Sequence, residues 1–390
     1  MAEFKKREQI NLPYFNAQTD AVAALDFSFD ARYLAVAYSN GADVWDLDKT
    51  NTVPISTTHG RRVTGRIRSL AWFPTRHRLI LAHDSGVVYV VTFGINSVAT
   101  AGVREPGFHQ NAVSIAVLND NLFAVAFTKT VQIRYERPGS QDSLEGDWAL
   151  LGCLKSPPAI QGLSISSLTI DSIHTIKDQR LLVSYGKMII VEWLILSVEP
   201  FYANIQKLIH APGSVTDVSS NDSYLISDNA AGSYQLFSLL YSSSVTFIPR
   251  YPGTDMAQQI SAAKFLGRDL IIGGGNGQLV LWNTEASRLQ NLKVDIDKRS
   301  HALIEKFCCI YKASSDVAYI AAVVGGSSQM IIWEWNGSSA LEPKQHRETV
   351  LNHVSVQHKV RKCRLNLNLG VMFLILMTVF VVILKYRIDN

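Results

Sequence analysis

The chain has 390 residues, a net charge of +4 at pH 7 and 47% hydrophobic residues. So small a charge gives no support for nucleic-acid binding, and the length allows a large folded core. The four cysteines include no C-x-x-C pair, which excludes a disulfide framework and an ordinary zinc site. This cysteine usage is typical of a reducing compartment.

The N-terminal residues 1–15 carry several charges and lack the apolar stretch of a secretory signal. We therefore expect the body of the protein to stay in the cytosol. The following segment, residues 22–48, alternates between apolar runs and turn residues. Its three runs VAALDF, YLAVAYS and ADVWDL, with Asn40-Gly41 between the last two, predict three short antiparallel strands.

The same order of strands and turns returns along the chain. Six further copies occupy residues 67–93, 113–137, 168–194, 215–239, 260–284 and 303–337. The third strands end near Trp45, Val91, Tyr135, Glu192, Phe237, Trp282 and Trp333. Most of these spacings are close to 45 residues, a period typical of β-propeller blades.

We predict an all-β fold, a single seven-bladed β-propeller over residues 21–338, with six or eight blades as open alternatives. A sheet of three or four strands cannot cover both of its faces alone, so the blades must stack radially. Segments between the copies supply outer strands, for example 52–56, 148–155 and 289–297. Within the N-terminal segment 1–20, residues 7–15 are expected to complete the last blade and close the ring.

Two copies carry a family resemblance. FSFDARYLAVAYSNGADVWDL (27–47) and LIIGGGNGQLVLWNT (270–284) resemble WD40 repeats, and His109 before the strand at Val113 resembles the usual Gly-His start. The resemblance covers roughly residues 20–337, although Trp45-Asp46 is the single literal Trp-Asp pair. It implies a rigid ring that binds a protein partner, and it does not imply catalysis.

The loop HGRRVTGRIRS (59–69) is the candidate partner-binding surface. It carries Arg61, Arg62, Arg66 and Arg68, and it lies where one blade leads into the next. A solvated loop is the alternative. The glycine-rich GGGNG (273–277) lacks the Lys-Ser/Thr of a phosphate loop and reads as a hairpin turn. We predict no catalytic residue, no cofactor and no metal site.

The C-terminal segment predicts a membrane anchor. Residues 369–384 are uncharged and mostly apolar, and extension to Leu365 gives a helix of about 30 Å, long enough to span a bilayer. We predict a transmembrane helix at 365–385, a polar and basic tether at 339–364 and a short lumenal tail at 386–390. The flanking basic residues are Lys359, Arg361, Lys362 and Arg364 before the helix, and Lys385 and Arg387 after it.

The excess of basic residues before the helix predicts a cytosolic N-terminal domain on a single-pass, tail-anchored protein. The basic cluster also favours anionic lipid headgroups. Cys363 within it is a candidate for palmitoylation, with an unmodified cysteine as an equal alternative. The endoplasmic reticulum is the favoured membrane, and the mitochondrial outer membrane or another endomembrane stays open.

The sequence therefore favours a membrane-tethered protein-interaction scaffold, which binds membrane lipid through its tail and an unidentified protein through its propeller. The alternative is a guanine-nucleotide exchange factor, because the layout is similar to the Sec12 family of membrane-anchored propellers. That resemblance implies a small GTPase partner at the endoplasmic reticulum. The family's long glycine-rich loop in the first blade has only the short turn YSNGADV (38–44) as its counterpart here.

Overall fold

The computed structural model describes most of the body of the chain. The described residues are 4–12, 21–38, 41–49, 56–57, 65–93, 98–103, 110–137, 147–155, 157, 165, 168–177, 179–197, 200–210, 213, 215–219, 224–228, 234–239, 244–247, 263–267, 270–275, 278–283, 288–293, 304–324 and 328–336. The predicted tether, transmembrane helix and lumenal tail lie outside them. Among the described residues, no helix has the length and hydropathy needed to cross a bilayer.

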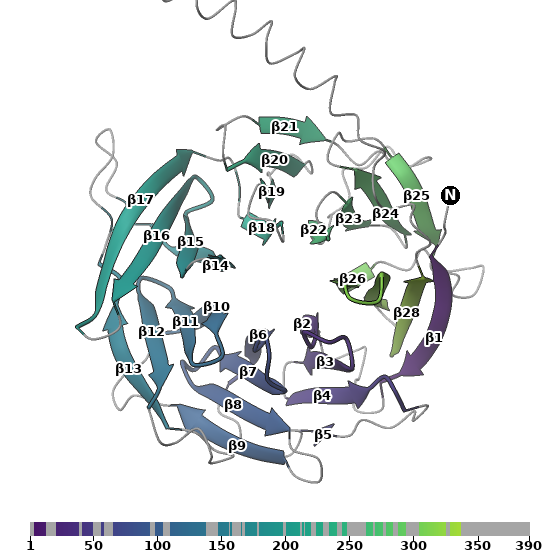
Figure 1. Ribbon diagram of the computed structural model, residues 1–390, viewed down its shortest axis with the longest axis horizontal. Helices are drawn as coiled ribbons and strands as arrows, with labels where there is room; N and C mark the ends of the chain where they lie inside the picture. Colours follow the sequence, from purple (N-terminus) through teal and green to yellow (C-terminus); the bar gives the residue numbers. More distant parts are fainter. Residues whose placement is uncertain are drawn as a thin grey trace, which may run out of the picture. The chain divides into compact units, whose positions relative to one another are not determined.

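The described residues form seven four-stranded antiparallel sheets, numbered here in chain order (Figure 1). Sheet 1 contains β2 (Val22–Phe27), β3 (Tyr33–Tyr38), β4 (Gly41–Asp46) and β5 (Ser56–Thr57). Sheet 2 contains β6 (Ile67–Trp72), β7 (Arg78–His83), β8 (Val88–Phe93) and β9 (Val98–Val103). Sheet 3 contains β10 (Ala112–Asn119), β11 (Leu122–Phe127), β12 (Val131–Glu136) and β13 (Trp148–Cys153). Sheet 4 contains β14 (Ile170–Ile176), β15 (Arg180–Tyr185), β16 (Ile189–Ser197) and β17 (Tyr202–His210). Sheet 5 contains β18 (Val215–Val218), β19 (Tyr224–Asp228), β20 (Tyr234–Ser238) and β21 (Ser244–Phe247). Sheet 6 contains β22 (Ala263–Leu266), β23 (Leu270–Gly275), β24 (Gln278–Asn283) and β25 (Arg288–Lys293). Sheet 7 contains β26 (Ile304–Lys312), β27 (Val317–Val324), β28 (Gln329–Asn336) and β1 (Lys5–Asn11).

Sheet 7 combines the two ends of the repeat region. β26, β27 and β28 follow one another, and β1 from the N-terminus pairs antiparallel with β28, from Lys5 opposite Glu334 to Asn11 opposite Gln329. The sequence predicted such a closing strand at 7–15, and the structure places it at Lys5–Asn11. The N-terminal strand therefore covers the outer edge of the last sheet, which would otherwise present unpaired backbone groups.

The burial of each strand follows from its place in its sheet. The second strands β3, β7 and β11 are buried at every position, because both of their faces pack against neighbouring sheets. The first strands β2 and β6 contain both buried residues and partly or fully exposed ones. One face of each first strand thus packs in the core while the other is reached by solvent.

The seven sheets pack side by side in a closed order. Each first strand contacts the first strand of the next sheet, and β26 of sheet 7 contacts β2 of sheet 1. Six clusters of buried apolar residues in the described part of the chain each join two neighbouring sheets. Between sheets 6 and 7, Phe307 packs against the bare Cα of Gly274. This all-β arrangement fits a β-propeller (Figure 1).

Hydrogen bonds and ion pairs between polar side chains connect neighbouring sheets. Arg78 of β7 donates to Glu136 of β12 at 2.7 Å, and both side chains are almost fully buried. In the turn between β2 and β3, Asp30 lies 2.9 Å from Nε2 of His77 in sheet 2. Such contacts fix how one sheet is rotated against the next, in addition to the apolar packing.

Candidate functional site

The first strands of all seven sheets surround a central channel. Its volume is ≈ 450 Å³, and β2, β6, β10, β14, β18, β22 and β26 each contribute lining residues. The lining is mixed, with apolar residues such as Leu25 and Ile115 beside charged ones such as Asp26 and Lys264. The channel is therefore a partly polar cavity at the axis of the ring, and residues from every repeat line it.

Short side chains link neighbouring first strands around this channel. Several of these side chains accept or donate a hydrogen bond across the gap between one sheet and the next. The links are Ser69 Oγ accepting from Ile115 N at 3.2 Å, Ser114 Oγ accepting from Ile173 N at 3.3 Å, Ser172 Oγ donating to Val215 O at 3.0 Å, Asp217 Oδ2 accepting from Phe265 N at 2.7 Å, and Cys309 Sγ donating to Phe265 O at 3.2 Å. Because first strands of different sheets share no backbone ladder, these side chains satisfy backbone groups that face the channel.

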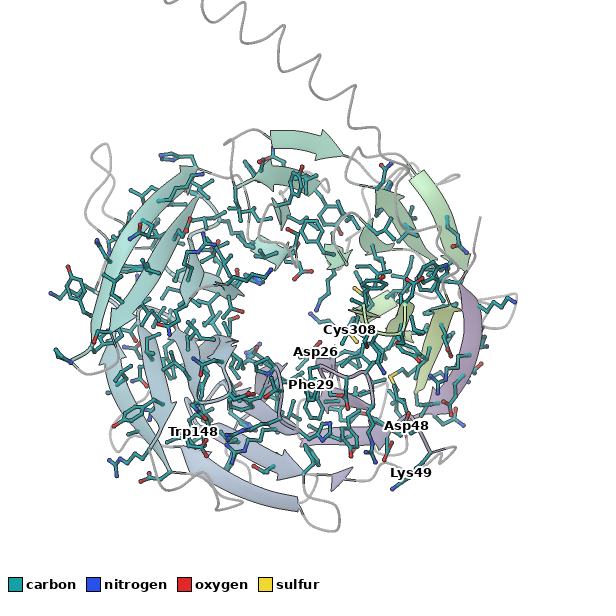
Figure 2. The ribbon with its side chains drawn as sticks, in the orientation of Figure 1. Asp26, Phe29, Asp48, Lys49, Trp148 and Cys308 are labelled. Carbon is teal, nitrogen blue, oxygen red and sulfur yellow. The ribbon has the colours of Figure 1, made fainter. Side chains whose placement is uncertain are left out.

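One cluster of ionisable side chains lies among these links. Asp26 comes from sheet 1, Asp217 from sheet 5 and Lys264 from sheet 6, and the lysine acts electrostatically on both carboxylates. Figure 2 shows Asp26 close to the centre of the ring, with Cys308 of sheet 7 nearby. The three groups thus act on one another electrostatically across the channel although their residues lie far apart in the sequence.

Burial and the attraction between opposite charges shift the pKa values of this cluster in opposite directions. Burial raises the pKa of Asp26 to about 6, although Lys264 and the N–H of Phe27 act to lower it. Burial likewise raises the pKa of Asp217, against the effect of Lys264. For Lys264, burial disfavours the charge, but the two carboxylates outweigh it and the pKa lies above its ordinary value. The lysine is therefore a permanent cation at neutral pH and a poor nucleophile.

The neighbouring histidine and thiols are uncharged at neutral pH. His174 donates from Nε2 to the carbonyl of Val215 at 2.9 Å, and burial lowers its pKa, so the ring is neutral at pH 7. Burial raises the pKa of both Cys308 and Cys309, which keeps the two thiols protonated. In the part of the chain that the structure describes, no three His, Cys, Asp or Glu side chains are placed to bind a metal ion.

The predicted arginine surface is described in part. Arg66 and Arg68 lie at the start of β6, where the N–H of Arg66 donates to Asp84 at 2.7 Å and the guanidinium of Arg68 lies 3.8 Å from the same carboxylate. The Arg68 side chain is 55% exposed and also borders the channel. Arg61 and Arg62 lie outside the described residues, as do the membrane-flanking basic residues and Cys363. The structure thus brings Arg66 and Arg68 together at one turn.

The channel cluster was not predicted from the sequence, although a signal for it exists. Asp26, Asp217 and Lys264 occupy the same position in three first strands, opposite Ala35, Ile226 and Ile272 of the second strands. Each interrupts a short apolar strand in its own copy. Alignment of the seven copies by strand register would therefore have shown ionisable residues at one channel-facing position.

Comparison with known proteins does not add to this assignment. No protein-family model matches the chain, and a search of curated proteins finds no match.

Proposed function

We propose that this protein is a WD40-type, seven-bladed β-propeller that serves as a protein-interaction platform on the cytosolic face of a membrane. In this proposal the seven sheets form the platform, and residues 365–385 form the helix that holds it at the bilayer. The protein partner is unidentified, and the membrane is that of the endoplasmic reticulum or another organelle. The proposal rests on the ring in the structure and on the apolar C-terminal segment in the sequence.

The observation that carries the platform function is how the polar groups of the channel are used. Two carboxylates raise the pKa of Lys264 and keep it charged, His174 donates to a backbone carbonyl, and burial keeps the thiols of Cys308 and Cys309 protonated. General acid–base or nucleophilic catalysis needs a group that can change its protonation state near the operating pH and reach a substrate. Lys264 and the two thiols do not titrate near neutral pH and His174 is bonded to the backbone, which favours a rigid scaffold over an enzyme; Asp26, with a pKa of about 6, is the described channel group that does titrate there.

The rim at the start of β6 is the partner surface that the proposal favours. Arg66 and Arg68 stand beside the turn that carries Asp84, and their side chains are exposed. Arginine is enriched at protein interfaces because its planar group donates several hydrogen bonds to carboxylates. The partner is therefore expected to offer an acidic surface.

Proximity labelling from the N-terminus of the full-length chain, followed by affinity capture of the labelled proteins, tests this function. A specific partner should be captured by the natural protein and lost with the Arg66→Ala/Arg68→Ala double variant. Arg137→Ala is the matched control. Arg137 is also exposed and, like Arg68, lies beside an aspartate, in this case Asp147 just before β13 of sheet 3. Equal capture by both variants would remove the arginine rim from the proposal.

A second candidate is nucleotide exchange on a small GTPase, which the layout similar to the Sec12 family favours. The turn between β3 and β4 argues against it, since β3 ends at Tyr38 and β4 begins at Gly41, too close for an elongated loop. Nucleotide release from a panel of small GTPases, measured with the full-length protein, separates the two functions. Strong acceleration for any one GTPase would replace the platform function with exchange.

A further inference from the structure

The first strands of sheets 2, 3 and 4 begin at one face of the ring, which we call the entry face. Ser69 of β6 accepts a hydrogen bond from the N–H of Ile115 on β10, and Ser114 of β10 accepts one from the N–H of Ile173 on β14. In both pairs the third residue of one first strand meets the fourth residue of the next. The three strands therefore run in the same direction and start at the same level around the channel.

The turns that join the second and third strands of sheets 2 and 3 lie at the entry face as well. In sheet 2, Asp84 follows β7 and accepts from the N–H of Arg66, just before β6, at 2.7 Å. In sheet 3, Lys129 follows β11 and donates from its ammonium group to the carbonyl of Leu168, just before β14, at 3.3 Å. The turns and the strand starts thus form one surface around the mouth of the channel.

Basic residues outnumber acidic ones on the described part of the entry face in sheets 2 to 4. The exposed basic residues are Arg66, Arg68, Lys129, Lys155 and Lys187, and the partly buried acidic residues are Asp84 and Asp171. Lys155 lies there because Leu154, the residue before it, donates from its N–H to the carbonyl of Val131 at the start of β12. The channel adds equal numbers of carboxylates and ammonium groups, from Asp26, Asp217, Lys264 and Lys306. The entry face of these sheets therefore carries an excess of positive charge.

The opposite face of the same sheets combines its arginines with carboxylates. The ion pairs there are Arg76–Glu136 at 3.2 Å, Arg137–Asp147 at 3.0 Å and Arg180–Glu192 at 3.1 Å. On the entry face, Asp84 lies 3.8 Å from the guanidinium of Arg68 and also accepts from the backbone of Arg66. Asp171 accepts from the backbone of Lys187 at 2.5 Å. Both acidic residues of the entry face are thus bonded to the backbone, and the exposed cations exceed what they neutralise.

The turn of sheet 4 presents a lysine in a strained backbone conformation. Gly186 and Lys187 have φ angles of 57° and 55°, in the left-handed region that glycine adopts freely and lysine rarely. The N–H of Lys187 donates to Asp171, and its carbonyl accepts from the N–H of Gly213 at 2.8 Å, so hydrogen bonds hold the turn from two sides. Met188, the next residue, is 53% exposed. Glycine or asparagine would form this turn at lower cost, so a lysine held there indicates a function for its side chain.

We infer that the entry face of sheets 2 to 4 binds an extended, acidic segment of the protein partner, in which carboxylates contact Lys129 and Lys187 and an apolar side chain contacts Met188. The inference rests on the proposed platform function and extends its arginine rim by two sheets. Because the cations are spread over three neighbouring sheets, one compact group cannot contact them all. Arg68 borders the channel, so its ligand must reach into the channel mouth, which a narrow polypeptide can do and a flat bilayer cannot. The flexible thioether of Met188 suits an apolar side chain of the segment.

The first test uses a labelled peptide of glutamate residues around one leucine, and a second peptide with lysine in place of glutamate. Fluorescence anisotropy measures the Kd of each peptide for the purified full-length protein. We expect the glutamate peptide to bind more tightly. The Lys129→Glu/Lys187→Glu variant should lose roughly tenfold in that affinity, because like charges then face each other, and it should gain affinity for the lysine peptide.

Lys49→Glu/Lys177→Glu is the matched control for that variant. Both lysines are exposed on the opposite face, after β4 and after β14, and the change in net charge is the same. This control should leave the Kd of the glutamate peptide nearly unchanged. An equal loss in the control, or equal binding of the two peptides, would overturn the inference. Displacement of the glutamate peptide by phosphatidylserine vesicles, and not by phosphatidylcholine vesicles, would assign the face to an anionic membrane instead.

The second test separates the function of Lys187 from its place in the fold. Lys187→Asn removes the cation and puts a residue that tolerates the left-handed conformation into the turn. The variant should melt at or above the temperature of the natural protein and still bind the glutamate peptide roughly threefold more weakly. Unchanged affinity would contradict the role of Lys187. The platform function can fail separately, because it depends on capture of a cellular partner, whereas these measurements use the purified protein and the peptides alone.

Discussion

The guanidinium of Arg78 on β7 donates to the carboxylate of Glu136 on β12 at 2.7 Å, and the two side chains are 5% and 0% exposed. Arg76 reaches the other oxygen of the same carboxylate at 3.2 Å. This contact joins sheets 2 and 3, with Arg78 and Glu136 buried and Arg76 partly exposed at its edge. A buried ion pair is a weak source of net stability, but the loss of one partner leaves an uncompensated buried charge.

We predict that Glu136→Ala destabilises the protein by about 3–5 kcal/mol, because it leaves Arg78 buried and unpaired. Urea unfolding of the full-length protein measures this change. Asp147→Ala breaks the exposed pair with Arg137 and should cost less than about 1 kcal/mol. The apolar pair Arg78→Met/Glu136→Leu should recover most of the stability. Equal costs for the buried and the exposed pair would mean that water reaches Glu136.

Removal of the closing strand should open the ring. Deletion of residues 1–12 removes β1, strips the buried side chains Ile10 and Leu12 from the core between sheets 7 and 1, and exposes the edge of β28. We expect the shortened protein to aggregate or to melt well below the natural protein. Differential scanning fluorimetry and size-exclusion chromatography report both outcomes. Deletion of residues 1–3 alone is the control, and a similar melting temperature for both deletions would mean that β1 does not support the ring.

A glycine on β13 makes room for an aromatic ring of sheet 4. A Cβ at Gly152 would lie 2.3 Å from the ring of Phe201, so Gly152→Ala forces that ring to move. We predict a destabilisation of about 1–3 kcal/mol, typical of overpacking. In the background of Phe201→Ala, the same substitution should cost little, because the clash is gone. Unfolding free energies of the four proteins give the coupling, and an unchanged cost of Gly152→Ala would show that another contact is responsible.

Cysteine reactivity should differ sharply between the surface and the ring interior. Cys153 is exposed, whereas burial raises the pKa of Cys308 and Cys309 and lowers their thiolate fraction. At pH 8, iodoacetamide should modify Cys153 in the native protein much faster than the other two. Peptide mass spectrometry assigns each rate, and denatured protein, in which all sites should react, is the control. Fast native labelling of Cys309 would show that the channel cluster leaves a reactive thiolate.

The predicted tail should determine location. The full-length protein should stay in the membrane during alkaline extraction, and the protein without residues 365–390 should be released. The basic residues 359–364 alone attract lipid only over a Debye length of about 8 Å. An acceptor sequon added after Asn390 should be glycosylated if the tail enters the endoplasmic reticulum, while Asn221 and Asn336 should stay unmodified. Gel mobility before and after glycosidase treatment measures glycosylation of the added sequon and of the two natural ones. Glycans on Asn221 or Asn336 would reverse the predicted orientation.

Local patterns in the sequence were sufficient to predict the all-β class and the order of the strands. Alternating apolar residues and turn dipeptides specify where a strand begins and ends, and the recurrence near 45 residues predicts that equivalent sheets stack. The N-terminal strand was predicted as well, since a ring of sheets leaves one edge to be covered. Its bounds, Lys5–Asn11, came from the structure, as did the short β5 at Ser56–Thr57.

The contacts that hold the ring together depend on the tertiary structure. Asp26 and Lys264 line the same channel because the seven first strands converge on one axis, and Arg78 contacts Glu136 because two sheets face each other at one rotation. Neither pair is close in sequence, and each charged residue alone is compatible with a solvated surface position. The sequence by itself therefore determined the repeating unit and the apolar C-terminal segment. Only the packed ring decided which charges are buried together, because the cost of a buried charge depends on its neighbours in space.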